Sequence, residues 1–342
     1  MPLVQARAFG ILHTIDTRSP SLRAANRSDK VSCSRHSQVH YWEHNDRTQT
    51  NPERYNLMKL VTYQSELGPR VAGIRDGSYV DLNRADPEVP ACIKALLAQW
   101  PGGRGRAIEA LAAGHSLPAE QLTFVSPVPN SEKIICVGLN YMEHAKESGA
   151  SLPEVPVIFN KFPTAASSHG ASIVLPKLSS KVDYEAELVV VIGRGGRHIR
   201  SENALNHVAA YCCGNDVSAR DWQLERPGGQ WLLGKSFDSF APFGPYLVTD
   251  DEVPNPGDLN IQLRLNGQTM QQSHTSLLIF PVEEVIAYVS GVCTLSPGDL
   301  IFTGTPSGVG FARETPVFLK PGDTVEVEIE KLGVLSNPVV SE

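Results

Sequence analysis

Two carboxylates that stand two residues apart, Glu185 and Glu187, are the strongest candidates for chemistry in this sequence. They belong to a stretch, 182–192, whose last five residues are all apolar, as is typical of a strand that enters the core. Side chains alternate across a strand, so both glutamates are predicted to project from the same face. Carboxylates placed this closely repel each other unless a proton or a cation separates them. The pattern indicates a site for a hard divalent cation, although a solvated strand end would show the same pattern.

A third oxygen ligand is available from Asp216, which follows the mainly apolar run 208–213. That run predicts a second buried strand, and Asp216 would lie near its end. Magnesium is typically bound by a few carboxylates and keeps waters that a substrate can displace. The alternative is that Asp216 begins a turn or caps the segment that follows it.

His144 and Glu147 are a candidate pair for proton transfer. They stand three residues apart in a predicted short helix, 141–148, that ends before Gly149, and this spacing puts both on one helical face. A carboxylate beside an imidazole orients the ring and raises its basicity, which a general base requires. An exposed helix with solvated charges would give the same spacing.

Two glycine-rich turns, 193–196 and 304–310, lack the spacings of nucleotide-binding loops. The second turn can still present backbone N–H groups and the Thr305 hydroxyl to a carboxylate. A nucleophilic serine is disfavoured because no GxSxG elbow is present.

The composition is that of a folded, soluble protein. The chain has 342 residues, is 41% hydrophobic and 20% charged, and carries a formal net charge of −7, which argues against a nucleic-acid partner. Its six cysteines form no CxxC pair, which disfavours a zinc knuckle or a disulfide scaffold and indicates a reducing compartment. No apolar run approaches the length of a membrane-spanning helix, so no membrane association is expected.

Three parts are expected along the chain. Residues 1–57, rich in arginine and serine, form a poorly structured extension, a targeting segment or the product of a misplaced start codon. The expected location is therefore cytoplasmic, or the mitochondrial matrix if this segment is a transit peptide. Residues 58–125 form a small β-rich module, with strands at 59–63, 70–75 and 78–82 and helices at 91–100 and 108–113. Residues 130–342 show many short strands and few helices, such as 282–289, without strict β-α-β alternation, so the predicted fold class is α+β, mostly β.

Five motifs in order closely resemble the fumarylacetoacetate hydrolase superfamily. They are Gly138-x-Asn140-Tyr-x-x-His144-x-x-Glu147, Asp183-x-Glu185-x-Glu187, Asn215-Asp216-Val-Ser-x-Arg220-Asp-x-Gln223, Gly234-Lys235-x-x-Asp238 and Gly304-Thr-Pro-x-Gly-Val-Gly310. The resemblance spans roughly 130–340. It implies the mixed β-roll of the fumarylacetoacetate hydrolase C-terminal type, a bound Mg²⁺ or Mn²⁺ and a homodimer.

The same resemblance implies roles for individual residues. The metal ligands are expected to be Glu185, Glu187 and Asp216; the catalytic groups are His144 and Glu147 on a lid-like helix, with Lys235 near the metal; the substrate-binding residues are Arg220, Gln223, Thr305 and Lys161.

The resemblance implies a metal-dependent enzyme that acts on small 2-oxo, or 1,3-dicarbonyl, carboxylic acids. Such an acid can chelate the cation, which then stabilises the enolate formed during reaction. The predicted reaction is oxaloacetate tautomerisation or acylpyruvate-type C–C hydrolysis. A decarboxylase, isomerase or hydratase of the same superfamily is the first alternative, and a catalytically silent dimeric binding protein is the alternative from another class.

Overall fold

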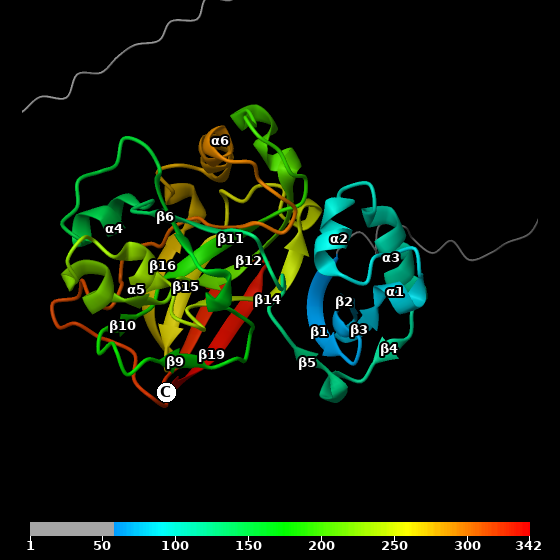
Figure 1. Cartoon of the computed structure of the whole chain (residues 1–342), viewed down its shortest axis with the longest axis horizontal. Coiled ribbons are helices and arrows are strands. Elements are labelled where there is room, and N and C mark those ends of the chain that lie inside the picture. Colours follow the sequence, from blue (N-terminus) through cyan, green and yellow to red (C-terminus); the bar gives the residue numbers. More distant parts are fainter. Residues whose placement is uncertain (1–57) are drawn as a thin grey trace, which may run out of the picture. The chain divides into compact units, whose positions relative to one another are not determined.

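Two fully buried strands, β11 (Ala186–Ile192) and β12 (Val208–Asn215), form the centre of the largest sheet. Their apolar side chains lie on both faces, as expected for strands that are covered on both sides. They pair antiparallel, with Ala186 opposite Asn215. The computed structural model, drawn in Figure 1, describes residues 58–342, so the prediction for residues 1–57 lies outside the described residues.

The largest sheet has twelve strands, paired mainly antiparallel. Its order is β4 (Ser116–Leu117), β3 (Ser78–Asp81), β2 (Gly68–Arg75), β1 (Lys59–Ser65), β14 (Ala241–Thr249), β12, β11, β17 (Leu300–Phe302), β6 (Ile134–Gly138) and β7 (Val157–Lys161), while β5 (Thr123–Phe124) pairs with β1 and β8 (Ala166–Ser167) pairs with β14.

A second, five-stranded sheet packs against the centre of the first, since β15 and β18 contact β11 and β12. Its order is β16 (Gln268–His274), β15 (Asn260–Leu265), β18 (Thr324–Ile329), β19 (Gly333–Ser341) and β9 (Ile173–Leu175). Burial alternates along β15 and β18, so one face of this sheet lies in the core and the other faces solvent. The alternation of apolar and polar residues along β15 and β18 therefore agrees with the packing of this sheet on one face only.

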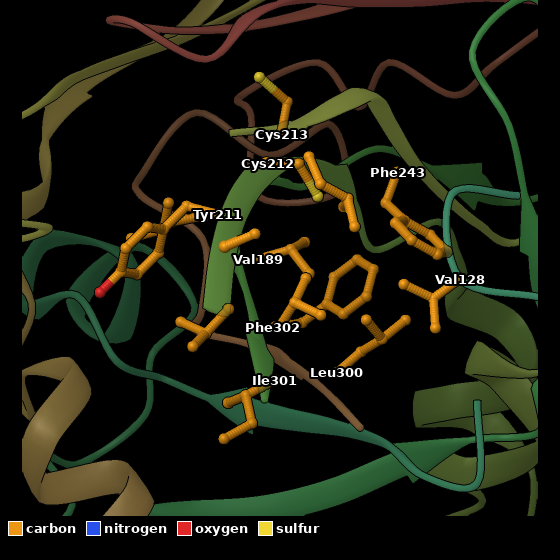
Figure 2. Close-up of a cluster of buried hydrophobic side chains, with 14 of the residues drawn as sticks. Val128, Val189, Tyr211, Cys212, Cys213, Phe243, Leu300, Ile301 and Phe302 are labelled. Atoms are coloured by element: carbon orange, nitrogen blue, oxygen red, sulfur yellow. The ribbon is translucent and has the colours of Figure 1, made fainter. Parts of the chain in front are cut away.

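Figure 2 shows part of the core around the central strands, including Val189, Tyr211, Phe243 and Phe302. Phe302 of β17 lies opposite Val189 in the sheet. Gly214 is needed here, because a Cβ at this position would overlap Val189 and Phe302. This close packing fixes the ends of β11 and β12, where the candidate carboxylates lie.

The N-terminal module combines β1–β3 with helices α1 (Leu82–Ala85), α2 (Ile93–Ala98) and α3 (Arg104–Ala113). The predicted strands and both predicted helices are confirmed. The exception is Leu82, which was predicted to end the strand at 78–82. It begins α1 instead, because the Asp81 side chain accepts a hydrogen bond from the Arg84 N–H and caps that helix. Pairing of β1 with β14 crosses the predicted boundary between 58–125 and 130–342, and that division stays a prediction.

Three helices follow in the larger part: α4 (Met142–Glu147), α5 (Trp231–Lys235) and α6 (Val282–Val292). A π-helical turn, η5 (Asp221–Glu225), precedes α5. The 3-10 turns are η2 (Ala119–Gln121), η3 (Pro163–Ala165), η4 (Ser201–His207), η6 (Asp250–Glu252) and η7 (Thr275–Leu277). The predicted helices at 141–148 and 282–289 are confirmed as α4 and α6. No helix among residues 58–342 has the length and apolar character needed to cross a bilayer.

The prediction of one continuous strand over 182–192 is wrong. A short strand, β10 (Val182–Asp183), pairs with β13 (Ser218–Ala219), and β11 begins only at Ala186. The chain leaves the sheet at Tyr184 and Glu185, so simple alternation does not describe how the two glutamates are placed.

Candidate active site

Three buried carboxylates meet where β11 begins and β12 ends. Glu185, Glu187 and Asp216 each offer an oxygen, and these oxygens lie within 4.8 Å of one another. Glu187 belongs to β11, Asp216 directly follows β12, and Glu185 lies in the break before β11. The structure thus brings together the three residues for which a metal-binding role was predicted.

Side-chain amides hold the backbone at the break. The Glu185 N–H donates to Asn215 Oδ1 at 2.9 Å, and the Ala186 N–H donates to Gln271 Oε1 at 2.8 Å. The Asp216 N–H donates to the Glu185 carbonyl oxygen at 2.9 Å. These bonds satisfy the backbone donors where the sheet is interrupted, and they keep Glu185 beside Asp216.

Two lysines neutralise part of this acidic cluster. Lys235 Nζ lies 2.7 Å from Glu185 Oε2 and 2.9 Å from Asp216 Oδ2. Lys161 Nζ lies 2.6 Å from Asp216 Oδ1 and also donates to three carbonyl oxygens, of Val217, Lys235 and Phe240. Lys161 is 1% exposed, so its ammonium group is enclosed by protein.

The two glutamates differ in their charge environment. Burial disfavours the charged form of Glu185, but the positive charges of Lys235 and Arg220 outweigh burial and lower its pKa to about 2. Burial and the negative charges of Asp216 and Glu185 raise the pKa of Glu187 well above its usual range. Glu187 is therefore the carboxylate that most needs a positive partner.

The donor set fits a hard divalent cation. Four buried carboxylates, those of Asp183, Glu185, Glu187 and Asp216, face three buried cations, those of Lys161, Lys235 and Arg220, so the cluster has one excess negative charge when every group is ionised, as cation binding requires. Asp216 Oδ1 receives no well-directed hydrogen bond although Lys161 Nζ is close. Carboxylate oxygens of this kind suit Mg²⁺ or Mn²⁺.

His144 and Glu147 of α4 form the expected pair. His144 Nδ1 lies 2.8 Å from Glu147 Oε1, and Glu147 Oε2 accepts a hydrogen bond from the Gly308 N–H at 2.9 Å. The carboxylate favours the tautomer with the proton on Nδ1, which leaves Nε2 free to accept a proton. The His144 ring is buried and lines the same cavity as the glutamates.

A cavity of about 160 Å³ collects most of the predicted site residues. Its polar lining comes from His144, Ser148, Glu185, Glu187, Arg220, Gln223, Lys235 and Thr305, and its apolar lining includes Val137, Leu139, Phe159, Leu224, Trp231 and Phe311. Glu147, Asp216 and Lys161 do not line it; they lie behind the lining residues that they contact. The place of Lys161 favours a role in holding Asp216 over direct contact with a substrate.

Arg220 is committed to protein partners. Its Nε donates to Asp183 Oδ2 at 2.9 Å, its Nη1 donates to Gln223 Oε1 at 2.9 Å, and its Nη2 lies 2.7 Å from Glu185 Oε1. The guanidinium carbon also lies 4.4 Å from the centre of the Phe311 ring. Gln223 thus presents its amide NH₂ group, not its oxygen, as the free part of this pair.

The turn at 304–310 presents N–H groups to carboxylates, as the sequence predicted, but these carboxylates belong to the protein itself. The Gly304 N–H donates to Glu187 Oε2, and the Gly310 N–H donates to Asp183 Oδ1, both at 2.8 Å. A Cβ at Gly308, whose φ is +103°, would overlap the Met270 carbonyl oxygen. The glycines let the turn approach the acidic cluster closely.

Three residues that hold the site were missed as functional residues: Asp183, Asn215 and Gln271. Asp183 and Asn215 stand beside predicted ligands in the sequence, and that position was an available signal. Gln271 lies in a polar stretch with no such signal.

Known proteins resemble nearly all of the described chain. Residues 133–340 match the family described as fumarylacetoacetate (FAA) hydrolase C-terminal. The human protein named oxaloacetate tautomerase FAHD2A, mitochondrial, is 45% identical over 289 residues, which cover 83% of this chain and 92% of that protein. The fumarylacetoacetate hydrolase domain-containing protein 2 homolog of Dictyostelium discoideum is 43% identical over 308 residues, which cover 84% of this chain and 99% of that protein.

Solved structures agree with these matches. Fumarylacetoacetate hydrolase from Exiguobacterium antarcticum superposes with a TM-score of 0.72 at 34% identity, covering 83% of this chain and 100% of that one. Maleylpyruvate hydrolase from Sphingobium sp. SYK-6, in complex with manganese(II) ion and pyruvate, gives a TM-score of 0.69 at 29% identity, covering 83% and 99%. The fold class and the resemblance inferred from the motifs are confirmed, and the chain belongs to the fumarylacetoacetate hydrolase family of enzymes.

Proposed function

We propose that this protein is a Mg²⁺- or Mn²⁺-dependent enzyme that acts on small 2-oxo carboxylic acids, with oxaloacetate tautomerisation as its reaction. The observation that carries the proposal is that one cavity is lined by His144 and by Glu185 and Glu187, with Asp216 beside them. The relatives named oxaloacetate tautomerase support the choice of reaction.

Charge explains why a cation and an acid belong in this cavity together. With all of these groups ionised, three buried cations against four buried carboxylates leave a charge of −1, which repels an anionic substrate. A divalent cation changes the sum to +1, and when bound it supplies positive charge to the keto and carboxylate oxygens of a 2-oxo acid. Glu185, Glu187 and Asp216 would hold it.

The protein's own residues supply the proton transfer. Tautomerisation moves one proton from C3 of oxaloacetate to the oxygen on C2. His144 Nε2 can take the C3 proton, and the negative charge of Glu147 stabilises the imidazolium that results, because its Oε1 accepts a hydrogen bond from the Nδ1–H group. The same imidazolium can then return the proton to the oxygen. Lys235, held by Glu185 and Asp216, provides a second positive charge at the cavity wall.

Acylpyruvate-type hydrolysis is the second candidate reaction. The apolar part of the cavity lining favours it, since Phe159 and Trp231 pack edge to face with ring centres 5.5 Å apart and offer a surface for an acyl group. The solved relative named maleylpyruvate hydrolase supports the same reading. In this reaction His144 would take its proton from water.

The enol form of oxaloacetate absorbs in the ultraviolet, so its conversion to the keto form can be followed directly. Full-length protein with MnCl₂ should accelerate the decay of enol absorbance, and EDTA should abolish the acceleration. A panel of acylpyruvates tests the hydrolytic alternative in the same assay. Absence of turnover with the whole panel in the presence of Mn²⁺ or Mg²⁺ would refute the proposal and favour a catalytically silent protein.

We also propose a homodimer in the mitochondrial matrix. Relatives are named mitochondrial, and the arginine- and serine-rich residues 1–57 have the composition of a targeting segment. Residues 1–57 fused to a fluorescent protein should direct it to mitochondria, whereas a cytoplasmic signal would support the alternative location. Analytical ultracentrifugation of the full chain tests the dimer.

A further inference from the structure

Gln271 of β16 joins the metal-ligating segment to the glycine-rich turn through three hydrogen bonds. Its Oε1 accepts from the Ala186 N–H at 2.8 Å. Its Nε2 donates to Thr305 Oγ1 at 2.8 Å and to the Pro306 carbonyl oxygen at 2.8 Å. The side chain is 1% exposed, so these bonds are made without competition from bulk water.

The partners leave only one orientation for the Gln271 amide. The Ala186 N–H can only donate and the Pro306 carbonyl can only accept, so the oxygen must face Ala186 and the NH₂ group must face Pro306 and Thr305. Thr305 Oγ1 then accepts a hydrogen bond from the Gln271 NH₂ group. The hydroxyl proton of Thr305 must therefore point elsewhere, and Thr305 lines the cavity.

We infer that Gln271 is a positioning residue that makes the Thr305 hydroxyl a hydrogen-bond donor toward the bound 2-oxo acid. This inference rests on the proposed function, because a 2-oxo acid presents carboxylate and keto oxygens that only accept. Without Gln271, the Thr305 hydroxyl can turn its proton to the Pro306 carbonyl oxygen, which would have lost its donor. The cavity would then present an acceptor where the substrate needs a donor.

Gln271 has a second effect on the same site. Ala186 lies between Glu185 and Glu187, and its N–H is held by Gln271 where the sheet is interrupted. Loss of this bond loosens the segment that carries both glutamates. Thr305 makes no such contact with the segment, so a change at Thr305 should affect the acid and leave the cation unaffected.

A double-mutant cycle tests the inference. The variants are Gln271→Leu, Thr305→Val and the two combined, with Thr305→Ser as a variant that keeps the hydroxyl. Gln272→Leu is the matched control, since Gln272 is the neighbouring glutamine of β16 and its side chain is exposed. Calorimetry measures the Kd of Mn²⁺ and, at saturating Mn²⁺, the Kd of pyruvate, the 2-oxo acid present in the solved maleylpyruvate hydrolase complex.

Thr305→Val should weaken pyruvate binding by about 10-fold or more, the usual effect of losing a hydrogen bond to a charged group, with Mn²⁺ binding unchanged. Gln271→Leu should weaken pyruvate binding similarly and Mn²⁺ binding as well. In the Thr305→Val background, Gln271→Leu should add less than about threefold, because the donor that it orients is already gone. Thr305→Ser, which keeps the hydroxyl, should bind pyruvate more tightly than Thr305→Val, and Gln272→Leu should resemble the wild type.

Losses that multiply fully in the double variant, or a Gln271→Leu protein that matches Gln272→Leu, would overturn the inference. If the leucine variant does not fold, Gln271→Met replaces it, since Met is close to Gln in length, carries no charge and lacks both donors. A wild-type protein that binds Mn²⁺ but no 2-oxo acid would instead refute the proposed function, and the inference would fall with it.

Discussion

His144 and Glu147 are joined by a hydrogen bond of 2.8 Å between Nδ1 and Oε1. The other oxygen of Glu147 is held by the Gly308 N–H, so the pair links α4 to the glycine-rich turn. The carboxylate therefore has two tasks: it orients the imidazole, and it fixes the helix that carries both residues beside the acidic cluster. Each task is open to a direct test.

Replacing His144 by Ala should lower the turnover of the best substrate by about 100-fold or more, the usual contribution of a general base. The Kd of Mn²⁺ should change little, because His144 does not belong to the carboxylate group that offers metal ligands. Steady-state kinetics and calorimetry measure the two quantities. Wild-type turnover in this variant would remove the dyad from the mechanism.

Replacing Glu147 by Gln should lower turnover in the same direction as His144→Ala, because an amide cannot stabilise the imidazolium with a negative charge. Glu143→Gln is the matched control, since Glu143 lies on the same helix with an exposed side chain that pairs with Lys146. Equal turnover in the two glutamine variants would contradict the assignment.

Replacing Asp216 by Ala should weaken Mn²⁺ binding by at least about 10-fold, because one of three carboxylate oxygens is lost and Lys161 and Lys235 then leave excess positive charge beside the site. Titration calorimetry on the chelated protein measures the change. Asp258→Ala, at a position where the side chain is 73% exposed, should bind Mn²⁺ as the wild type does. Unchanged affinity in the Asp216 variant would exclude this residue as a ligand.

Replacing Lys235 by Met should change metal affinity in the opposite direction. The Lys235 ammonium group lies within hydrogen-bond distance of Glu185 and Asp216 and competes with a cation for their oxygens. Its removal should leave Mn²⁺ bound at least as tightly as in the wild type, while turnover falls because a positive charge is lost from the cavity wall. Weaker Mn²⁺ binding in this variant would show that Lys235 supports the metal site.

Sequence patterns predicted the parts of the fold that depend on local hydrophobic periodicity. The apolar run from Leu188 to Ile192 is a central strand, and the alternation near Lys59 marks the first strand of the N-terminal module. Periodicity did not predict the break at Tyr184 and Glu185. That break is stabilised by side chains from distant parts of the chain, of which Gln271 is 85 residues away from Ala186.

The candidate site shows the same limit. Residue type and spacing mark Glu185, Glu187 and Asp216 as candidate ligands but fit a solvated strand end and a turn or cap as well; the family resemblance assigns them as ligands and adds Lys235 and Arg220. Neither route reveals which side chains face the cavity and which lie behind it. Only the structure shows that Lys161 lies behind the cavity lining, because its ammonium group is enclosed by three carbonyl oxygens and Asp216.

A protein that begins at Met58 should retain the fold and the activity, because the first strand begins at Lys59 and the described contacts of the site all lie within residues 58–342. Thermal unfolding and the tautomerase assay, compared with the full-length protein, measure both properties. An insoluble product, or one whose melting temperature falls by more than about 10 °C, would show that residues 1–57 stabilise the folded chain.

The last prediction concerns Asp81, which anchors the N-terminal module. Its carboxylate receives two hydrogen bonds from Arg70, at 2.6 and 2.9 Å, one from the Tyr63 hydroxyl and one from the Arg84 N–H. Burial alone would raise the pKa of Asp81, but the hydrogen bonds from Arg70 and Tyr63 outweigh burial and hold it below the ordinary value of 3.8. The ionised carboxylate therefore stabilises the folded chain above pH 3.8. That contribution is lost as the pH falls through the lower pKa of the folded state.

Replacing Asp81 by Asn should lower the free energy of unfolding at pH 7 by about 1–3 kcal/mol, because the partly buried Arg70 guanidinium loses its charged partner. The difference between wild type and variant should shrink as the pH falls below about 4, where protonation removes the same charge from the wild type. Urea unfolding at a series of pH values measures it. Asp76→Asn, in the exposed turn between β2 and β3, is the control and should show no such dependence. A difference that stays constant from pH 7 to pH 3 would mean that Asp81 acts through its shape and hydrogen-bonding geometry, and that its charge does not contribute to stability.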